Sequence, residues 1–360
     1  MKKLCYILPE YNENIAEHFY HLYEFLERIS EKLDIFLIIE KGNVGSRTSN
    51  IKRIYVQKFR FLPLRFLESF CIILKARFLG YRSFYTHYCY IGGVNAGIIS
   101  RLFNGKSYYW HCEMIWEFKQ KIFSKIGLNS SLKSSHFLVT GSEKMKQGYA
   151  KHYGLEKNRI KVMPNWINLR RFKVQVTDYQ LRAPKNILFI HWLSERKGAH
   201  LLIPVIKELN TKYELQNTSY KIVGDGPLKE KILKEIKENK LEKYVNVLGK
   251  IPNKDLVKYY AMADIFILPS LQEGFPRVLL EAMAMGVPYV AFDVGAVREI
   301  SPPTAQEFIV KPGDVKEFAK KIQILLSSKE IYDRFRKEEL EKVKEYSLDR
   351  ALNKFIKLFS

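Results

Sequence analysis

The chain has 360 residues, of which 47% are hydrophobic and 27% charged, a balance that excludes a disordered chain and is typical of a folded soluble protein. Its length exceeds what one hydrophobic core usually supports, so two domains are expected. No apolar run reaches the roughly 18 residues that a membrane-spanning helix needs. Four cysteines without CxxC spacing favour reduced thiols in a cytosolic protein.

Positive charge gathers in one part of the chain. Residues 41–180 carry 25 Lys and Arg against 6 Asp and Glu, a net charge of +19, while the whole chain has +22. An excess of that size favours an anionic partner, either nucleic acid, anionic lipid or a phosphorylated substrate. The alternative is a basic surface that serves solubility alone.

Short β-branched or aromatic runs alternate with longer amphipathic stretches, which favours parallel sheets flanked by helices. The apolar start of the chain turns polar at Pro9, too soon for a signal peptide, so a first buried strand is expected there. In chain order, the first half is predicted to contain strand Leu4–Leu8, helix Ile15–Ser30, and strands Ile35–Ile39, Phe84–Tyr88, Tyr108–Trp110, Phe137–Thr140 and Ile160–Met163.

The second half restarts the same rhythm. The polar stretch Asn168–Lys185 is expected to link two domains, over 1–170 and 182–340, with a C-terminal helix in 341–360 that packs back on the first. Two such α/β domains would leave a cleft at the carboxyl ends of their strands, where ligands bind. The predicted elements are strand Asn186–His191, helix His200–Leu209, strand Tyr220–Val223, helix Leu228–Asn239, strand Val245–Leu248, helix Lys254–Met262, strand Ile265–Leu268, helix Arg277–Met285 and strand Tyr289–Phe292.

The most informative segment is Ile265–Gly286, IFILPSLQEGFPRVLLEAMAMG, which is typical of a buried strand, a loop and a helix. Pro276 stands where the first helical turn is expected, a favoured place for proline. The loop and the helix N-terminus would present backbone N–H groups to a diphosphate. Glu273 lies in the loop and Glu281 about one turn into the helix, where a carboxylate can accept hydrogen bonds from ribose hydroxyls. The alternative is an ordinary strand–helix unit with surface glutamates.

With its flanks, this segment resembles the retaining glycosyltransferases of the GT-B fold, the large group called group 1 or family 4. The family signature is PS-x-x-EG-F-x-x-x-x-x-EAMA-x-G-x-P. The chain matches it at Pro269-Ser270, Glu273-Gly274-Phe275, Glu281-Ala282-Met283-Ala284, Gly286 and Pro288, and matches neighbouring family phrases at Met163-Pro164-Asn165, Val223-Gly224-Asp225-Gly226-Pro227 and Tyr260-Ala261. The resemblance covers residues 137–300 and is weak over 1–130.

The resemblance implies an α/β fold of two Rossmann-like domains facing across a cleft. It also implies transfer of a sugar from a nucleotide-diphosphate donor to a glycan or lipid-linked acceptor, in the assembly of bacterial surface polysaccharide or lipopolysaccharide. By position in the motif, Glu281 would hold the donor ribose and Glu273 would face the transferred sugar. Gly274 and Phe275 would offer N–H groups to the donor, and Gly224 would belong to the same donor site. His111, after strand Tyr108–Trp110, matches a family histidine that contacts the donor sugar.

The family also carries a basic pair, in a loop of the form G-R-L-x-x-x-KG. Here that loop reads HWLSERKG, from His191 to Gly198, so Lys197 matches, Trp192 stands at the arginine position, and Arg196 offers a nearby cation. Cleavage of the donor leaves negative charge on a phosphate, which must be stabilised. None of the nine aspartates is two residues from another, as a metal-binding Asp-x-Asp motif requires. Arg196, Lys197 and the helix N-terminus are therefore expected to do this without a metal or another cofactor.

Segment Lys58–Arg82, KFRFLPLRFLESFCIILKARFLGYR, mixes cations with apolar residues. It predicts either a helix that lies on an anionic membrane surface or a buried helix with snorkelling arginines. The first reading suits a cytoplasmic enzyme that is peripheral on the inner face of the cell membrane and uses a lipid-linked acceptor. Two rival functions stay open: a nucleic-acid-binding protein, although no nucleic-acid motif is recognised, and a non-catalytic GT-B homologue, which Trp192 favours.

Overall fold

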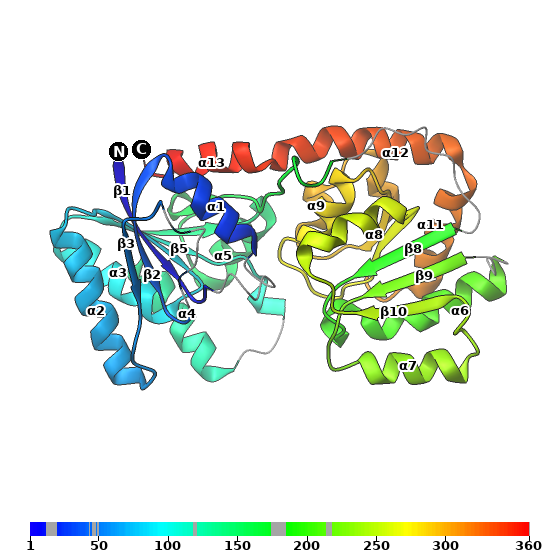
Figure 1. Cartoon of the computed structure of the whole chain (residues 1–360), viewed down its shortest axis with the longest axis horizontal. Helices are drawn as coiled ribbons and strands as arrows, with labels where there is room; N and C mark the ends of the chain where they lie inside the picture. The colour runs from blue at the N-terminus through cyan, green and yellow to red at the C-terminus, as the bar shows by residue number, and fades with distance from the viewer. Residues whose placement is uncertain are drawn as a thin grey trace. The chain divides into compact units, whose positions relative to one another are not determined.

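The computed structural model describes residues 1–11, 20–42, 44, 48, 50–117, 121–173, 185–213 and 218–359. The chain forms two compact units, Met1–Pro164 together with Ala351–Ser360, and Asn165–Arg350 (Figure 1). Each unit contains one parallel sheet with flanking helices, as the alternation of apolar runs predicted. The two units are described separately.

The first unit contains a seven-stranded parallel sheet in the order β3-β2-β1-β4-β5-β6-β7. Its strand interiors are apolar on both faces because helices cover both sides of such a sheet. The strands are β1 (Lys2–Leu8), β2 (Leu33–Ile39), β3 (Arg53–Val56), β4 (Ser83–His87), β5 (Lys106–Trp110), β6 (Phe137–Thr140) and β7 (Ile160–Val162). The helices are α1 (Tyr20–Ser30), α2 (Leu62–Phe78), α3 (Tyr90–Leu102), α4 (Ile122–Ser134) and α5 (Glu143–Tyr153), with short 3-10 turns η2 (Ile115–Glu117) and η3 (Lys157–Arg159).

The end of the chain also belongs to the first unit. Helix α13 (Leu348–Lys357) carries Phe355, which is fully buried. The ring of Phe355 lies 5.0 Å from that of Phe25 on α1 and 4.8 Å from that of Tyr85 on β4. Residues Ala351–Ser360 therefore supply part of the first unit's aromatic core.

The second unit contains a six-stranded parallel sheet in the order β10-β9-β8-β11-β12-β13. The strands are β8 (Lys185–Ile190), β9 (Thr218–Val223), β10 (Val245–Gly249), β11 (Ile265–Leu268), β12 (Tyr289–Phe292) and β13 (Ile309–Val310). The helices are α6 (Leu202–Lys212), α7 (Lys229–Glu238), α8 (Leu256–Met262), α9 (Arg277–Ala284), α10 (Val297–Ile300), α11 (Val315–Ser327) and α12 (Lys329–Lys342). Short 3-10 turns are η4 (Glu195–Lys197), η5 (Ala199–Leu201), η6 (Asn253–Asp255), η7 (Thr304–Phe308) and η8 (Val343–Tyr346).

Strand order reverses in the middle of each sheet, between β1 and β4 in the first unit and between β8 and β11 in the second. Open α/β sheets bind ligands outside the carboxyl ends of the strands at such a reversal. In the second unit, residues His191–Gly198 follow β8 and residues Pro269–Pro276 follow β11. These two loops carry most of the predicted site residues.

Main-chain contacts lock these two loops together. The carbonyl oxygen of Arg196 accepts hydrogen bonds from the amides of Leu271 at 3.0 Å and Gln272 at 3.1 Å. Gly198 has φ +68°, and a Cβ atom added to it would lie only 1.7 Å from the carbonyl oxygen of Pro269. Only glycine permits this approach, so the glycine that ends the HWLSERKG loop is required by the packing of backbone on backbone.

Some predicted boundaries were wrong, for identifiable reasons. The predicted helix His200–Leu209 begins instead at Leu202, which puts Pro204 in the first turn, where its missing N–H costs no hydrogen bond. The predicted strand Phe84–Tyr88 ends at His87, because Tyr88 has the left-handed φ of +59°.

The sequence analysis also missed two strands. Strands β3 and β13 were not predicted, since they have only four and two residues. The start of predicted helix Ile15–Ser30 and most of the predicted linker Asn168–Lys185 lie outside the described residues.

We expect Gly198→Ala to destabilise the second unit more than Gly313→Ala does. Gly313 also has a positive φ, +85°, but nothing lies within 4 Å of an added Cβ atom. Both variants would incur about 1 kcal/mol of left-handed strain, and Gly198→Ala a further cost of about 1–3 kcal/mol for the displaced loop. Urea unfolding of both variants measures the difference, and equal losses would contradict the proposed locking of the loops.

A second expectation concerns Glu339, a buried residue of α12 whose two carboxylate oxygens have no hydrogen-bond partner among the residues that the structure describes. Burial raises the pKa of Glu339 well above its ordinary value, although the Arg336 guanidinium acts in the opposite direction. A carboxyl with a raised folded-state pKa favours the folded state at low pH. This contribution is lost as the pH rises from the unfolded-state pKa of about 4.3 through the folded-state pKa.

Glu339→Gln should therefore raise the melting temperature at pH 8 by about 2–4 °C for each 1 kcal/mol gained, and the gain should shrink toward pH 4.5. Thermal unfolding across this pH range tests the expectation. Glu341→Gln, at an exposed position of the same helix, serves as the control and should show no such pH-dependent gain. A Glu339→Gln gain that stays constant with pH would show that the carboxyl is not the cause.

Candidate active site

The buried carboxylate of Glu273 forms the centre of the candidate site. It lies in the loop after β11, and its two oxygens accept hydrogen bonds from two residues of the loop after β8. His191 Nε2 donates to Oε1 at 2.9 Å, and Lys197 Nζ donates to Oε2 at 2.8 Å. The structure thus joins Glu273 and Lys197, both predicted site residues, across the reversal between β8 and β11.

The charge state of Glu273 follows from these contacts. Burial alone would raise the pKa of Glu273, but the Lys197 ammonium and the His191 ring outweigh burial, so that this pKa lies below its usual range. Glu273 is therefore a carboxylate near neutral pH and has no proton to donate. Its arrangement fits a fixed hydrogen-bond acceptor better than a general acid.

His191 is a site residue that the sequence prediction missed. Its Nδ1 accepts a hydrogen bond from the Trp192 amide at 2.9 Å, so the neutral ring carries its proton on Nε2 and donates it to Glu273. Burial lowers the pKa of His191; Glu273 opposes this shift, whereas Lys197 and Arg196 add to it. The available signal was the position of His191 at the end of a predicted strand, where the family pattern has glycine.

The predicted basic pair does not act as a unit. Lys197 is buried against Glu273, whereas the side chain of Arg196 is exposed and makes no hydrogen bond or ion pair with any described residue. Trp192, at the family's arginine position, has 55% of its surface exposed. The loop therefore offers one buried cation and one solvent-facing cation, with an exposed indole beside them.

Three predicted backbone positions differ in what they can offer a ligand. Gly224 has φ +145°, an added Cβ atom would lie 1.9 Å from the His191 carbonyl oxygen, and its amide already donates to Gly249 at 2.8 Å. Gly224 thus shapes the loop under His191. The amides of Gly274 and Phe275 have no acceptor among the residues that the structure describes, so they are available to a ligand.

Helix α9 follows this loop closely. Pro276 is its N-cap rather than its first helical residue, and the helix starts at Arg277. At the other end, Gly286 has φ +62° directly after the C-cap. The amides of Gly286 and Val287 bond back to the carbonyls of Met283 and Ala282 at 3.1 and 3.0 Å, a Schellman motif.

Glu281 lies on α9 and is buried apart from the Glu273 cluster. Its Oε2 accepts a hydrogen bond from the hydroxyl of Tyr260, on α8, at 3.0 Å. Burial raises the pKa of Glu281, while Arg277, the Tyr260 hydroxyl and Arg171 act in the opposite direction. Tyr260 stands in the family phrase that the sequence shares, but sequence reasoning gave it no role.

His111 lies in the first unit, directly after β5, and is buried. Its Nδ1 lies 2.6 Å from the hydroxyl of Tyr149, which itself donates to the carbonyl of Glu113 at 3.0 Å. Nδ1 therefore carries the proton and Nε2 is left as an acceptor. Burial lowers the pKa of His111 to about 3. The pKa of His87 is also lowered to about 3, mainly by burial and in addition by the nearby His111 ring. Both rings are neutral near pH 7.

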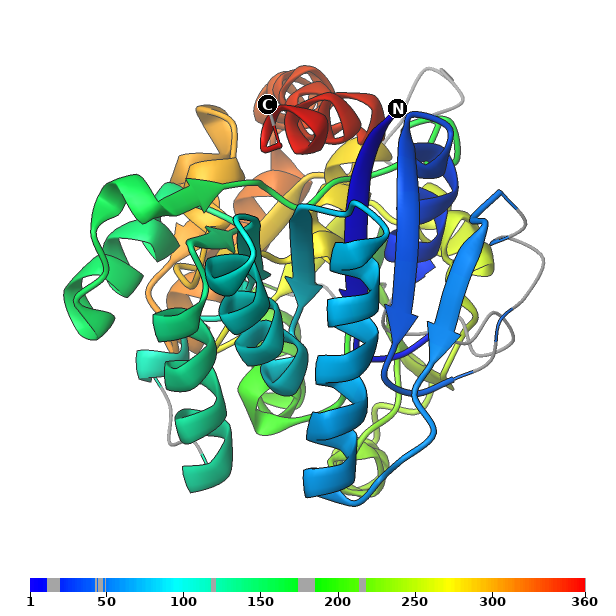
Figure 2. The same cartoon turned by 90° about the vertical axis from the view of Figure 1, so that its left-hand side faces the viewer.

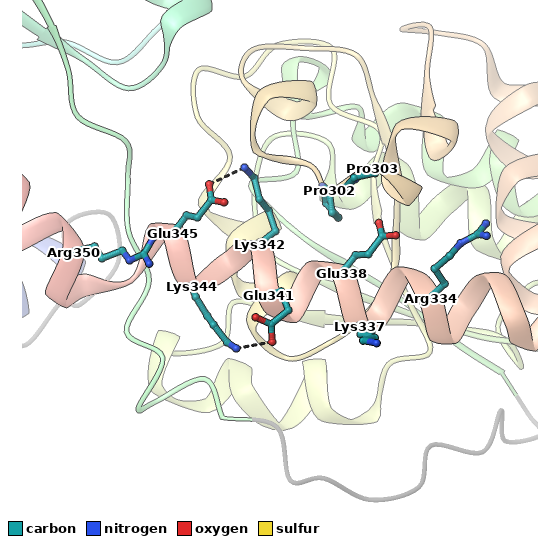
Figure 3. Close-up of a pocket in the computed structure, with 10 residues that line it drawn as sticks. All are labelled: Pro302, Pro303, Arg334, Lys337, Glu338, Glu341, Lys342, Lys344, Glu345 and Arg350. Carbon is teal, nitrogen blue, oxygen red and sulfur yellow. Dashed lines mark hydrogen bonds and ion pairs between the residues drawn. The ribbon is translucent and has the colours of Figure 1, made fainter.

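A groove of about 670 Å³ lies along α12 and contains none of the predicted site residues (Figure 3). Its lining carries five cations against three carboxylates, and Glu341 pairs with Lys344 and Glu345 with Lys342. The groove is lined by Pro302, Pro303, Arg334, Lys337, Glu338, Glu341, Lys342, Lys344, Glu345 and Arg350. Such solvated pairs mark an ordinary charged surface. Within the described ranges, no group of three or more His, Cys, Asp or Glu is placed to hold a metal ion.

Comparison with known proteins relates the second half of the chain to one family. The model of "Glycosyl transferases group 1" matches residues 179–342. The amylovoran biosynthesis glycosyltransferase AmsK of Erwinia amylovora is 30% identical over 46% of this chain and 42% of its own length. The putative teichuronic acid biosynthesis glycosyltransferase TuaC of Bacillus subtilis is 30% identical over 52% and 46%. The matched segment spans less than half of each relative.

Solved structures extend the likeness to the whole fold. Anabaena HepE, crystallised in complex with UDP, has a TM-score of 0.79 and 16% identity, covering 99% of both chains. This likeness shows the fold of two Rossmann-like domains that the motif predicted. Residues 179–342 are therefore similar to the group 1 glycosyl transferases, and the chain has the GT-B fold.

Proposed function

We propose that this protein is a retaining glycosyltransferase that moves a sugar from a nucleoside-diphosphate donor to a glycan or lipid-linked acceptor. The observation that carries the proposal is the Glu273–Lys197 pair beside the available amides of Gly274 and Phe275. A departing diphosphate needs a cation and N–H donors, and a transferred sugar needs a fixed acceptor for its hydroxyls. One loop pair at the sheet reversal offers all three.

Every predicted site residue except Gly224, which shapes the loop under His191, has a place in this proposal. Lys197, Arg196 and the two amides stabilise the charge that develops on the departing phosphate, without a metal. Glu273 orients the transferred sugar, and Glu281 holds the donor ribose. His111 is proposed to contact the donor sugar as a neutral hydrogen-bond acceptor, because burial keeps it unprotonated.

The class of acceptor is proposed from the relatives. AmsK and TuaC are named for amylovoran and teichuronic acid biosynthesis. We therefore propose an acceptor in bacterial surface polysaccharide or lipopolysaccharide assembly. The exposed Trp192, which replaces an arginine, favours one other candidate, a non-catalytic homologue. Release of nucleoside diphosphate in the presence of acceptor separates the two candidates.

We propose further that the first unit lies on an anionic membrane surface. Helix α2 buries one face in the core through Ile72, Ile73 and Ala76. On and beside its other face, five large apolar residues are 44–72% exposed: Phe61, Leu62, Leu64, Leu67 and Phe78. Its acidic residue Glu68 is occupied locally, since it accepts from the amides of Lys58 and Phe59. The outer face of α2 is therefore apolar without carrying a free negative charge.

Helix α4 adds a second apolar tip. Its first turns carry Ile122, Phe123 and Ile126, which are 58–84% exposed. Figure 2 shows α2 and α4 on the same face of the first sheet, with α3 between them and with their first turns at the same end. Exposed cations accompany both helices: Lys58 and Arg60 precede α2, Lys75 lies in its last turn, and Lys121 and Lys125 stand at the start of α4. Exposed apolar side chains accompanied by cations fit the interface of an anionic bilayer. No described helix is long and apolar enough to cross a membrane.

We expect Glu281→Ala to weaken donor binding about 10- to 100-fold, since it removes a buried carboxyl group that can accept hydrogen bonds from the ribose. Glu273→Ala should lower kcat about 100- to 1,000-fold with a smaller change in donor affinity. A thermal-shift screen of UDP-, GDP-, ADP- and CMP-sugars identifies the donor, and initial rates then give kcat and KM. Glu238→Ala, at an exposed position of α7, is the control. Unchanged kinetics in both site variants would contradict the assignment.

Vesicle flotation tests the membrane surface. The protein should bind phosphatidylglycerol-containing vesicles, bind phosphatidylcholine vesicles poorly, and dissociate as salt rises. Replacing Phe61, Leu62, Ile122 and Phe123 by Ser should weaken binding at least about tenfold, because each removes insertable apolar surface. Leu233→Ser with Leu248→Ser, exposed apolar residues of the second unit, should leave binding unchanged. Absence of binding at low salt, or equal binding by both variants, would refute the surface.

A further inference from the structure

We propose that His191 is a positioning residue that, in its neutral form, fixes the carboxylate of Glu273 for sugar transfer. The inference rests on the proposed function. It concerns a position where the family pattern has glycine and therefore no side chain. The starting observation is that both ring nitrogens of His191 are engaged, one by the main chain and one by Glu273.

The two hydrogen bonds of His191 run in opposite senses. The Trp192 amide donates to Nδ1 at 2.9 Å, and Nε2 donates to Glu273 Oε1 at 2.9 Å. Turning the ring over would break both bonds, so its orientation and its tautomer are set together. Since Lys197 holds the other oxygen of Glu273, the carboxylate is clamped at both ends. Lys197 alone would hold Glu273 by one oxygen, and the added hydrogen bond from His191 fixes the orientation of the carboxylate.

The same geometry requires a neutral ring. Protonation would place a proton on Nδ1 and set it against the Trp192 N–H, which would cost a hydrogen bond and bring two donors together. The charged groups around the ring are Glu273, Lys197 and Arg196. On the adjacent loop after β9, Asp225 is paired with Lys229 at 3.7 Å. The two cations outnumber the buried Glu273 carboxylate and therefore disfavour a positive charge on the His191 ring. Electrostatics and hydrogen bonding thus both favour the neutral ring.

This arrangement suggests what the two residues that depart from the family pattern, His191 and Trp192, do in the site. His191 and Trp192 replace a glycine and an arginine, so the loop loses a cation and gains a neutral donor aimed at Glu273. A neutral donor orients a carboxylate without neutralising it. The negative charge of Glu273 therefore stays balanced by Lys197 alone, and the role of His191 is geometric. Its loss should lower turnover while leaving donor affinity nearly unchanged.

The test uses two variants of the full chain. His191→Phe keeps a ring but removes both nitrogens, while His191→Gln keeps a side-chain N–H donor. We expect His191→Phe to lower kcat about 10- to 100-fold, which corresponds to loss of a hydrogen bond to a charged group, with donor KM changed less than about twofold. His191→Gln should restore most of this loss. Full kcat in His191→Phe, or a loss expressed mainly in KM, would overturn the proposal.

The pH dependence of kcat also tests the positioning role, because a residue with a purely structural role would not affect it. Because the neutral ring is the working form, wild-type kcat should fall as the pH drops through the pKa of His191, and His191→Gln should lack this limb. An identical acid limb in both proteins would count against the proposal.

An independent measurement separates this inference from the proposed function. Nitrogen-15 NMR of the imidazole at pH 7 should show His191 protonated on Nε2 alone, with no substrate or activity needed. A protein that has this tautomer but releases no nucleoside diphosphate would overturn the proposed function. A ring protonated on Nδ1 would overturn the clamp even in an active enzyme.

Discussion

The buried ion pair between Glu273 and Lys197 is the interaction on which the candidate site depends. A carboxylate taken out of water is costly unless a partner and hydrogen bonds compensate it, and both are supplied by the neighbouring loop. The pair can form only because β8 and β11 are adjacent in the sheet and their loops touch through backbone. The doubly wound topology thus places the chemistry, and Gly198 allows the close approach that keeps it in place.

The sequence was most predictive for strands that are buried, or nearly so, on both faces. Predicted strands Phe137–Thr140, Ile265–Leu268 and Tyr289–Phe292 agree with β6, β11 and β12 at both ends, because each is a continuous apolar run between polar residues. Strands β3 and β13 were missed, since a short strand at the edge of a sheet leaves little pattern.

The motif predicted the similarity to group 1 glycosyl transferases and the GT-B fold, but not the contacts of the site. His191 and Glu273 are 82 positions apart, and no local pattern shows that one will donate to the other. Composition likewise showed that cations gather in residues 41–180. It did not show that apolar side chains among them are exposed, since exposure depends on which helices pack alongside. The separation of Arg196 from Lys197 has the same origin: one turn of 3-10 helix sends adjacent cations to different environments.

The position of Phe355 has a consequence for the order in which the protein matures. Residues Asn165–Arg350 form one contiguous unit, whereas the first unit is completed by the last residues of the chain. During synthesis the second unit has its full sequence before the aromatic core around Phe25 and Tyr85 receives its final ring. Of the two units, the one whose synthesis begins first is thus the one completed second, and until Phe355 emerges its unfilled core is exposed to chaperones and proteases.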